Sequence, residues 1–244
     1  MPRFFTPSDN FDGSTVKITG DDSRHIARAL RMAVGDEITV CDMQGREHLC
    51  RLTKIRDEEC ECEILDSREG RTESPLHITL YMGYPKGDKL ELVIQKAIEL
   101  GASRIVPFES SRCVKRPKDD KIDKQTARLQ RIAEEAAKQC GRARLAEVAR
   151  PISFKEALEE AATADLPLFC YEGDGTVSLK SALADAVGKR TVSVIVGCEG
   201  GFSEKEAEEA RAAGLIPVNL GPRILRCETA PAYVLSAISY VLEL

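Results

Sequence analysis

Residues 1 to about 70 consist of short stretches in which apolar and polar positions alternate, the pattern of strands in a half-buried sheet. One helix is expected among them, from about Asp22 to Arg31, with Asp21 or Asp22 as its N-cap. The predicted strands are Thr15–Thr19, Glu37–Cys41, Leu49–Ile55 and Glu59–Leu65. This part of the chain therefore predicts a small β-barrel with one helix.

From Leu76 onward the pattern changes to strands that alternate with amphipathic helices. The predicted strands are 76–82, 104–108, 145–148, 166–171, 191–196 and 216–220. The predicted helices are 86–100, 122–140, 153–162, 178–186, one that Ser203 caps and Gly214 ends, and one that begins at Thr229 or Ala230. Alternation of this kind indicates an α/β domain with a parallel sheet and helices on both faces.

The segment Arg68–Pro75 is polar and contains both Gly and Pro, which makes it the best linker in the chain. A length of 244 residues allows one large domain or two modest ones, and either could bury a core. Because the pattern changes at this linker, we expect two domains, residues 1–70 and residues 74–244.

The formal net charge of −5 argues against a uniformly basic surface. Cations nevertheless cluster in the stretches Arg112–Lys118 and Lys138–Arg144, and at Arg24, Arg28 and Arg31. A local basic face on an acidic protein can bind phosphates, but solvated helix ends would explain each cluster equally well.

Nine cysteines occur without regular spacing, and the close pair Cys60 and Cys62 has no second pair to complete a zinc site. The pattern favours reduced, buried thiols in a cytoplasmic protein without a metal. No apolar run is long enough to span a membrane, and the first residues are too few and too polar for a signal peptide.

Two segments near the C-terminus have the same plan: an apolar strand, a glycine-bearing loop and a helix start. They are Thr191–Ser203 and Ile216–Ala230, and the second carries Arg226 and Glu228, a charged pair. Such loops at the carboxyl ends of neighbouring strands are where open α/β sheets bind ligands, although tight turns alone would also explain them. Neither matches the phosphate loop of nucleoside triphosphatases or the dinucleotide fingerprint of dehydrogenases.

The loops Gly197-Cys-Glu-Gly-Gly-Phe-Ser203 and Leu220-Gly-Pro-Arg-Ile-Leu-Arg-Cys-Glu-Thr-Ala230 together resemble the small-subunit rRNA uracil-N3 methyltransferases of the SPOUT superfamily. The resemblance covers the whole chain and includes the segments Pro2–Phe5, His25–Arg31, Lys86–Lys89, Gln95–Gly101, Ser111–Cys113 and Glu135–Arg142. The chain departs from the family where Cys198 replaces the usual Pro and Cys227 the usual Thr. Pro231 and Tyr233 are also less usual.

The resemblance implies an N-terminal PUA-like β-barrel that binds RNA and a C-terminal SPOUT-type α/β domain with a trefoil knot. It also implies S-adenosyl-L-methionine as the cofactor, ribosomal RNA within the small subunit as the partner, and a homodimer through the apolar last helix. The cofactor-binding residues would be Phe169, Tyr171, Val196, Gly197, Glu199, Gly200, Gly201, Leu220, Gly221, Ile224, Leu225, Arg226, Thr229 and Ala230.

Methylation of a uracil N3 requires loss of its proton, so the enzyme needs a base or cations that stabilise the anion. Glu228 is the candidate acid/base or orienting carboxylate, and Arg226 the candidate for stabilising the developing charge. The residues expected to bind RNA are Arg3, His25, Arg28, Arg31, Lys86, Lys89, Arg112 and Arg142. A lone helical histidine such as His25 is more often a packing residue.

Two other functions stay open. One is a related enzyme that methylates a ribose 2′-hydroxyl or another base, and its usual Ser-Leu-Asn type signature is replaced here by Arg226-Cys-Glu-Thr229. The other is a non-catalytic RNA-binding homologue, against which the intact Gly200, Gly201, Gly221 and Glu228 argue.

Overall fold

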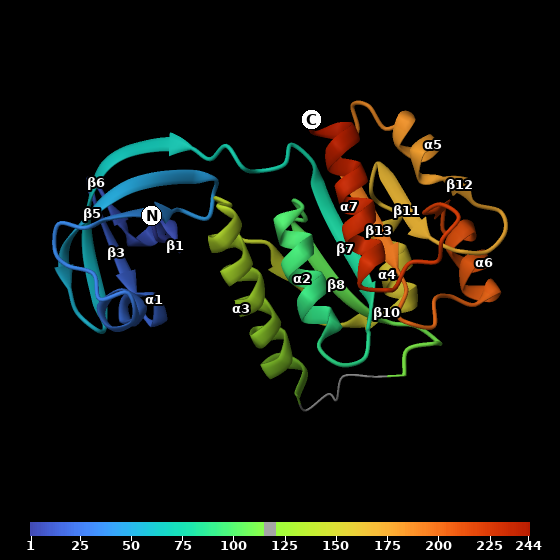
Figure 1. Cartoon of the computed structure of the whole chain (residues 1–244), viewed down its shortest axis with the longest axis horizontal. Coiled ribbons are helices and arrows are strands. Elements are labelled where there is room, and N and C mark those ends of the chain that lie inside the picture. Colours follow the sequence, from blue (N-terminus) through green and yellow to red (C-terminus); the bar gives the residue numbers. More distant parts are fainter. Residues whose placement is uncertain (115–120) are drawn as a thin grey trace. The chain divides into compact units, whose positions relative to one another are not determined.

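The computed structural model describes residues 1–114 and 121–244, which form two compact units (Figure 1). The N-terminal unit comprises Met1–Glu73 and Ala137–Leu145, and the C-terminal unit comprises Ser74–Ala136 and Ala146–Leu244. The first boundary falls within the predicted linker. The inclusion of Ala137–Leu145 was not expected from the sequence, and it follows from buried contacts such as the ion pair between Arg142 Nη2 and Glu73 Oε2 at 2.8 Å.

The N-terminal unit is built on a six-stranded sheet in the order β1-β4-β5-β6-β3-β2. Its elements are β1 (Arg3–Phe5), η1 (Ser8–Asn10), β2 (Phe11–Asp12), β3 (Thr15–Thr19), α1 (Asp21–Arg24), η2 (His25–Ala29), β4 (Glu37–Cys41), β5 (Arg46–Ile55) and β6 (Glu59–Glu69). The four predicted strands are confirmed, with β5 and β6 longer than expected. Because β1 and β2 lie at opposite edges of the sheet, the expected PUA-like barrel takes the form of a curled half-barrel.

The core of this unit contains three cysteines, Cys50, Cys60 and Cys62, packed among apolar side chains such as Phe4 and Ile26. Buried thiols of this kind behave as small apolar groups. Burial raises the pKa of Cys50 and of Cys62 to about 12, so both remain protonated and unreactive. None of the nine cysteines forms a disulfide within residues 1–114 and 121–244.

The predicted helix at Asp22–Arg31 differs from the observed structure. Gly20, with φ +72°, is the N-cap, and after one turn of α1 the chain enters the π-helical turn η2, in which Leu30 N–H donates to His25 O at 2.9 Å. A π turn adds a residue and rotates the side chains that follow. Ile26 is therefore buried, whereas Leu30 of the predicted apolar stripe is 41% exposed.

The C-terminal unit has a parallel sheet in the order β10-β8-β7-β13-β11-β14-β12, with β9 paired to β8. Its strands are β7 (His77–Gly83), β8 (Arg104–Glu109), β9 (Glu147–Val148), β10 (Ile152–Ser153), β11 (Leu166–Cys170), β12 (Val177–Ser178), β13 (Thr191–Val196) and β14 (Ile216–Asn219). Its helices are α2 (Lys89–Glu99), most of α3 (Ile122–Cys140), α4 (Phe154–Ala161), α5 (Leu179–Ala184), α6 (Glu204–Ala212) and α7 (Thr229–Leu242). The predicted α/β alternation is confirmed.

Helix starts follow the local chemistry closely. Ser153 with Glu156 and Ser203 with Glu206 form complete capping boxes at α4 and α6, as predicted. Helix α2 starts three residues later than expected, at Lys89, because Gly87 adopts φ +65° and cannot continue a right-handed helix.

Helices cover the central strands of this sheet. An aromatic cluster that includes Phe108, Phe154, Phe169 and Phe202 fills the space between the sheet and helices α4 and α6. Helices α2 and α7 pack against each other, and α7 also contacts β13 (Figure 1). In the described part of the chain, no helix combines the length and apolar character needed to cross a bilayer.

Candidate cofactor pocket

A pocket of about 590 Å³ opens in the C-terminal unit beyond the carboxyl ends of β11, β13 and β14. The two glycine-bearing loops form most of its wall, as expected for a ligand site of an open α/β sheet. The lining residues are Lys89, Cys170–Glu172, Val196–Phe202, Asn219–Glu228 and Ala230.

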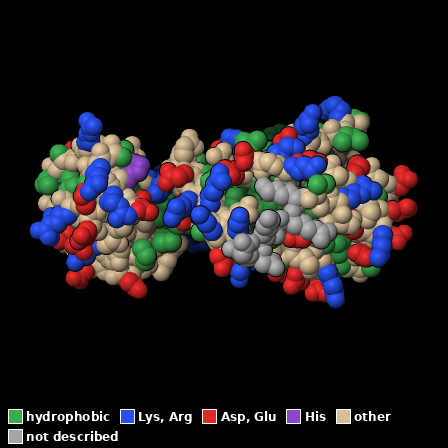
Figure 2. Space-filling model, turned by 90° about the horizontal axis from the view of Figure 1, so that it is seen from below, with side chains coloured by type: hydrophobic (Ala, Val, Ile, Leu, Met, Phe, Trp, Pro, Cys, Tyr) green, Lys and Arg blue, Asp and Glu red, His purple; other side chains and the backbone are tan. Residues whose placement is uncertain are grey.

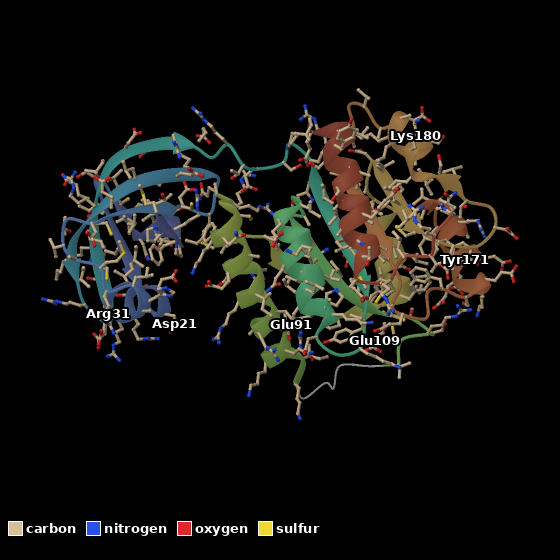
Figure 3. All side chains as sticks on the ribbon, in the orientation of Figure 1. Asp21, Arg31, Glu91, Glu109, Tyr171 and Lys180 are labelled. Carbon is tan, nitrogen blue, oxygen red and sulfur yellow. The ribbon has the colours of Figure 1, made fainter. Side chains whose placement is uncertain are left out.

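All of the predicted cofactor residues line this pocket except Phe169 and Thr229. Phe169 lies within β11, before its carboxyl end, and is fully buried in the aromatic core against Phe202, with ring centroids 4.4 Å apart. Thr229 is the first residue of α7. Tyr171, labelled in Figure 3, follows β11 and reaches the wall beside α6, where Arg211 lies over its ring.

Other lining residues were not predicted to bind the cofactor, although Lys89 and Glu228 were predicted for other roles. They are Lys89, Cys170, Glu172, Cys198, Phe202, Asn219, Pro222, Arg223, Cys227 and Glu228. Most are sequence neighbours of predicted ones. Lys89 comes from the start of α2, which follows β7, and the carboxyl end of β7 lies beside that of β13. The common edge of parallel strands could therefore have identified it.

The loop at 197–201 is held by close backbone packing. Gly201 has φ +60°, and its N–H donates to Cys198 O at 2.9 Å, which closes a tight turn. Gly83, at the end of β7, lies directly against this loop: a Cβ there would come within 2.6 Å of Cys198 N and 3.0 Å of Gly197 C. Only glycine fits this position without displacing the loop.

Lys89 joins two carboxylates at the pocket wall. Its Nζ lies 3.0 Å from Glu199 Oε1 and 3.5 Å from Glu228 Oε2, and the N–H of Lys86 also donates to Glu199 Oε1 at 3.0 Å. Burial by itself would raise the pKa of Glu199, but these hydrogen bonds outweigh burial and lower it. Both loops therefore present ionised carboxylates to the pocket.

The Cys227 thiol donates a hydrogen bond to Glu228 Oε2 at 3.2 Å. Together with the backbone N–H of Glu228 itself, this bond and the Lys89 ammonium lower the pKa of Glu228. Burial raises the pKa of Cys227 to about 12, so the thiol keeps the proton that it donates. Cys227 thus supplies the donor that a threonine hydroxyl would supply.

The charged pair expected between Arg226 and Glu228 does not form. Lys89 is the cation beside Glu228, whereas the Arg226 guanidinium lines the pocket and has no ion-pair partner among residues 1–114 and 121–244. The physical reason is that α2, which packs against α7, starts at Lys89 and brings its ammonium to 3.5 Å from Glu228 Oε2. Arg226 is therefore a cation available to a ligand.

The residues expected to bind RNA in the N-terminal unit divide into two groups. Arg3 and Arg142 are structural: Arg3 Nη1 donates to Glu47 Oε1 at 2.9 Å and to Arg142 O at 3.2 Å, and Arg142 is buried against Glu73. His25, Arg28 and Arg31 are exposed beside the short helix, with Arg28 paired to Asp57. Figure 3 shows Arg31 at the periphery of this unit.

In the C-terminal unit, Lys86 is exposed and Arg112 Nη1 donates to Gly200 O at 2.8 Å, so Arg112 supports the pocket loop. The cations Lys115, Arg116 and Lys118 of the predicted basic cluster lie outside the described residues. On the face of each unit shown in Figure 2, basic and acidic side chains are interspersed. On this face, the charges thus support local phosphate contacts rather than one broad basic surface.

Comparison with known proteins gives the family. A model of the RNA methyltransferase domain matches residues 72–239, and one of the RNA methyltransferase PUA domain matches residues 18–65. The ribosomal RNA small subunit methyltransferase E of Bacillus subtilis (strain 168) is 38% identical, over 100% of this chain and 98% of the relative.

Two solved structures are similar over nearly the whole chain. The ribosomal RNA small subunit methyltransferase E of Neisseria gonorrhoeae, bound to S-adenosyl methionine, has a TM-score of 0.87 and 33% identity, and covers 99% of this chain and 98% of its own. A methyltransferase of Legionella pneumophila with bound cofactor SAM has a TM-score of 0.88 and 28% identity, covering 98% and 96%. The two domain matches and the full-length relatives agree with the pocket described above. This chain therefore belongs to the ribosomal RNA small subunit methyltransferase E family and is an rRNA methyltransferase.

Proposed function

We propose that this protein methylates N3 of a specific uridine in small-subunit ribosomal RNA and holds S-adenosyl-L-methionine in the pocket between its two glycine-bearing loops. The observation that carries the proposal is the convergence of both loops, the second of which carries Arg226, on one pocket. Its volume of about 590 Å³ suits a cofactor of this size. Glu172 and Glu199 offer negative charge to a cationic ligand, and the solved relatives that bind this cofactor support the assignment.

When bound, the cofactor would supply a methyl group on a positively charged sulfur. The residues of the chain must then orient the uracil and stabilise the negative charge that its N3 gains as the proton leaves. Arg226 suits the second role, because this exposed residue lines the pocket and has no protein counter-ion among the described residues. Glu228 has a lowered pKa, which makes it a weak base and favours an orienting role in the transfer.

The homodimer, the trefoil knot and the cytoplasmic location are part of the same proposal. Helix α7 buries Val234, Leu235 and Ile238 but leaves Tyr233 and Tyr240 exposed at 46% and 75%, an apolar face that a second copy could cover. For the knot, the support is that the chain returns from β14 to pack α7 on β13 and α2. A protein that modifies ribosomal RNA works where ribosomes are assembled, hence the cytoplasm.

The direct test is to incubate the purified protein with S-adenosyl-L-methionine and small ribosomal subunits from cells that lack this modification, then identify modified nucleosides by mass spectrometry. Appearance of 3-methyluridine supports the proposal. A 2′-O-methylated nucleoside or another methylated base would favour the related enzymes instead. Cofactor binding without any methylation of subunits or naked RNA would favour a non-catalytic RNA-binding role.

RNA binding by the N-terminal unit predicts that Arg28→Glu with Arg31→Glu weakens affinity for ribosomal RNA without changing cofactor affinity. Both side chains are exposed, and each phosphate contact that is lost should lower the salt dependence of log K by about one unit of slope. Filter binding at several salt concentrations measures this slope. Arg51→Glu, an exposed arginine of the same unit, is the matched control. Equal slopes for both variants would remove Arg28 and Arg31 from the RNA interface.

Substitutions of Lys89 and Lys86 distinguish a role in the pocket from a role in RNA binding. Lys89 Nζ is bonded to Glu199, so we expect Lys89→Ala to lower turnover by roughly tenfold or more by loosening the pocket carboxylates, with the salt slope unchanged. The side chain of Lys86 is exposed, and its backbone N–H is the group that contacts Glu199, so Lys86→Ala should change the slope instead. Single-turnover kinetics and RNA binding separate the two effects. A reduced slope for Lys89→Ala would return this lysine to the RNA interface.

A further inference from the structure

Two buried thiols of the C-terminal unit meet beneath the pocket loop. Cys113 follows β8 and Cys198 follows β13, and these strands flank β7 on either side. The turn that carries Cys113 contacts the loop that carries Cys198, since Arg112 Nη1 donates to Gly200 O at 2.8 Å. The two thiols lie near enough for a side-chain hydrogen bond that shifts the pKa of each, and the residues are 6% and 4% exposed. Cys198 also lines the cofactor pocket, so the pair is reached from there.

Gly83 makes this meeting possible. It ends the strand that separates the two cysteines, and the backbone of the loop at Cys198 lies so close that a Cβ at Gly83 would come within 2.6 Å of Cys198 N. Because glycine places no side chain between β8 and β13, the thiols on either side can approach across the strand end. The contact is therefore a product of the fold and not of proximity in sequence.

The Cys113 sulfur lies beside hydrogen-bond donors of Ser110 and, at 3.9 Å, beside one acceptor, Phe108 O. The Ser110 N–H donates to it at 3.4 Å, and the Ser110 hydroxyl lies at the same distance. The hydrogen bond from Cys198, together with those from Ser110, outweighs burial and lowers the pKa of Cys113. By contrast, burial raises the pKa of Cys170 to about 12. Cys113 is thus suited to react as a thiolate, with Cys198 beside it as the second thiol.

We propose that Cys113 and Cys198 form a redox-sensitive pair, which a hydroperoxide converts into a disulfide that disables the cofactor pocket. The Cys113 thiolate attacks one peroxide oxygen and the O–O bond breaks, giving a sulfenic acid, while the departing oxygen takes up a proton and leaves as water or an alcohol. The Cys198 thiol then attacks the sulfenic sulfur. The S–S bond forms, the S–O bond breaks, and the hydroxyl leaves as water with the Cys198 proton. The two thiols lose two electrons and the peroxide gains them.

The consequence for the pocket follows from geometry. A disulfide draws the sulfurs from hydrogen-bonding separation to about 2.05 Å, so the loop or the turn at Cys113 must move. The turn is anchored, because Ser111 N–H donates to the buried Glu206 at 2.8 Å, and the loop is therefore the part that shifts. Glu199, next to Cys198, would be displaced from Lys86 and Lys89. This effect on the cofactor rests on the proposed function, whereas the disulfide itself does not.

The test treats the full-length protein with hydrogen peroxide, maps disulfides by peptide mass spectrometry, and measures the Kd of S-adenosyl-L-methionine by calorimetry before and after treatment. We expect a Cys113–Cys198 linked peptide and a Kd at least about tenfold weaker, both reversed by dithiothreitol. Cys113→Ser and Cys198→Ser should each abolish the response. Cys140→Ser, which removes a half-buried thiol outside the pocket, should retain it.

Absence of the linked peptide in the wild-type protein would overturn the proposal, and so would a linked peptide with unchanged cofactor affinity. If the reduced protein does not bind S-adenosyl-L-methionine, the proposed function fails first, and the peptide map alone then decides whether the thiol pair exists. A response that persists in Cys198→Ser would assign the effect to another cysteine and refute the pairing.

Discussion

Replacing Arg226 by alanine is expected to lower the rate of methyl transfer by about 10²–10³-fold, the usual cost of removing a group that stabilises charge in the transition state. Arg226 lines the pocket and has no ion-pair partner among the described residues, so we expect its charge to act on the substrate. Ground-state affinity for S-adenosyl-L-methionine should change little, since the substitution leaves the loop backbone in place. Single-turnover kinetics with small subunits, together with calorimetry, measure both quantities.

Arg223→Ala is the matched control for this prediction, because Arg223 lies on the same loop and also lines the pocket. It precedes Arg226 by three residues, and we assign it no role in the transfer step. Turnover that is unchanged in Arg226→Ala, or lowered equally in both variants, would exclude Arg226 as the group that stabilises the uracil anion.

The second large effect is expected from Gly83→Ala. The added methyl would lie 2.6 Å from Cys198 N and 3.0 Å from Gly197 C, both backbone atoms that cannot rotate away. Overpacking of this kind costs about 1–3 kcal/mol of folding free energy. Because the pocket loop must move to accept the methyl group, the affinity for S-adenosyl-L-methionine should fall by roughly a hundredfold. Thermal unfolding and calorimetry follow the two consequences separately.

Gly214→Ala provides the comparison. Gly214 has φ +91°, but an added Cβ meets nothing within 4 Å, so this variant carries backbone strain without a clash and lies outside the pocket. It should lose stability by about 1 kcal/mol and keep its affinity for the cofactor. Equal cofactor affinities in Gly83→Ala and Gly214→Ala would show that the contact with Cys198 does not shape the pocket.

Predictions from local pattern succeeded where the signal was local. The helix Ile122–Cys140, the strand Thr191–Val196 and the capping boxes at Ser153 and Ser203 occur with the predicted boundaries. Hydrophobic periodicity and capping interactions act within a few residues, so the local sequence alone is enough to predict these elements. The very short strands β1, β2, β10 and β12 were missed, since two or three residues carry no detectable period.

The candidate site was predictable in part for a similar reason. Each glycine loop follows an apolar strand, and parallel strands place such loops along one edge, which was enough to bring Gly197–Gly201 and Leu220–Ala230 together. The residues that bind RNA were less predictable. Arg3 and Arg142 looked like phosphate ligands, but each meets a carboxylate distant in sequence, Glu47 and Glu73. Only the fold shows that these charges are already neutralised.

By itself, then, the amino-acid sequence determined the α/β alternation, the change of pattern near residue 70 and the two loops that line the pocket, because all three depend on short-range chemistry. The tertiary structure decided which charges meet. It placed Lys89 rather than Arg226 beside Glu228, and it brought Cys113 to Cys198 across Gly83. Strand order and the packing of strand ends decide such contacts, and these arise from interactions between distant segments that no local pattern contains.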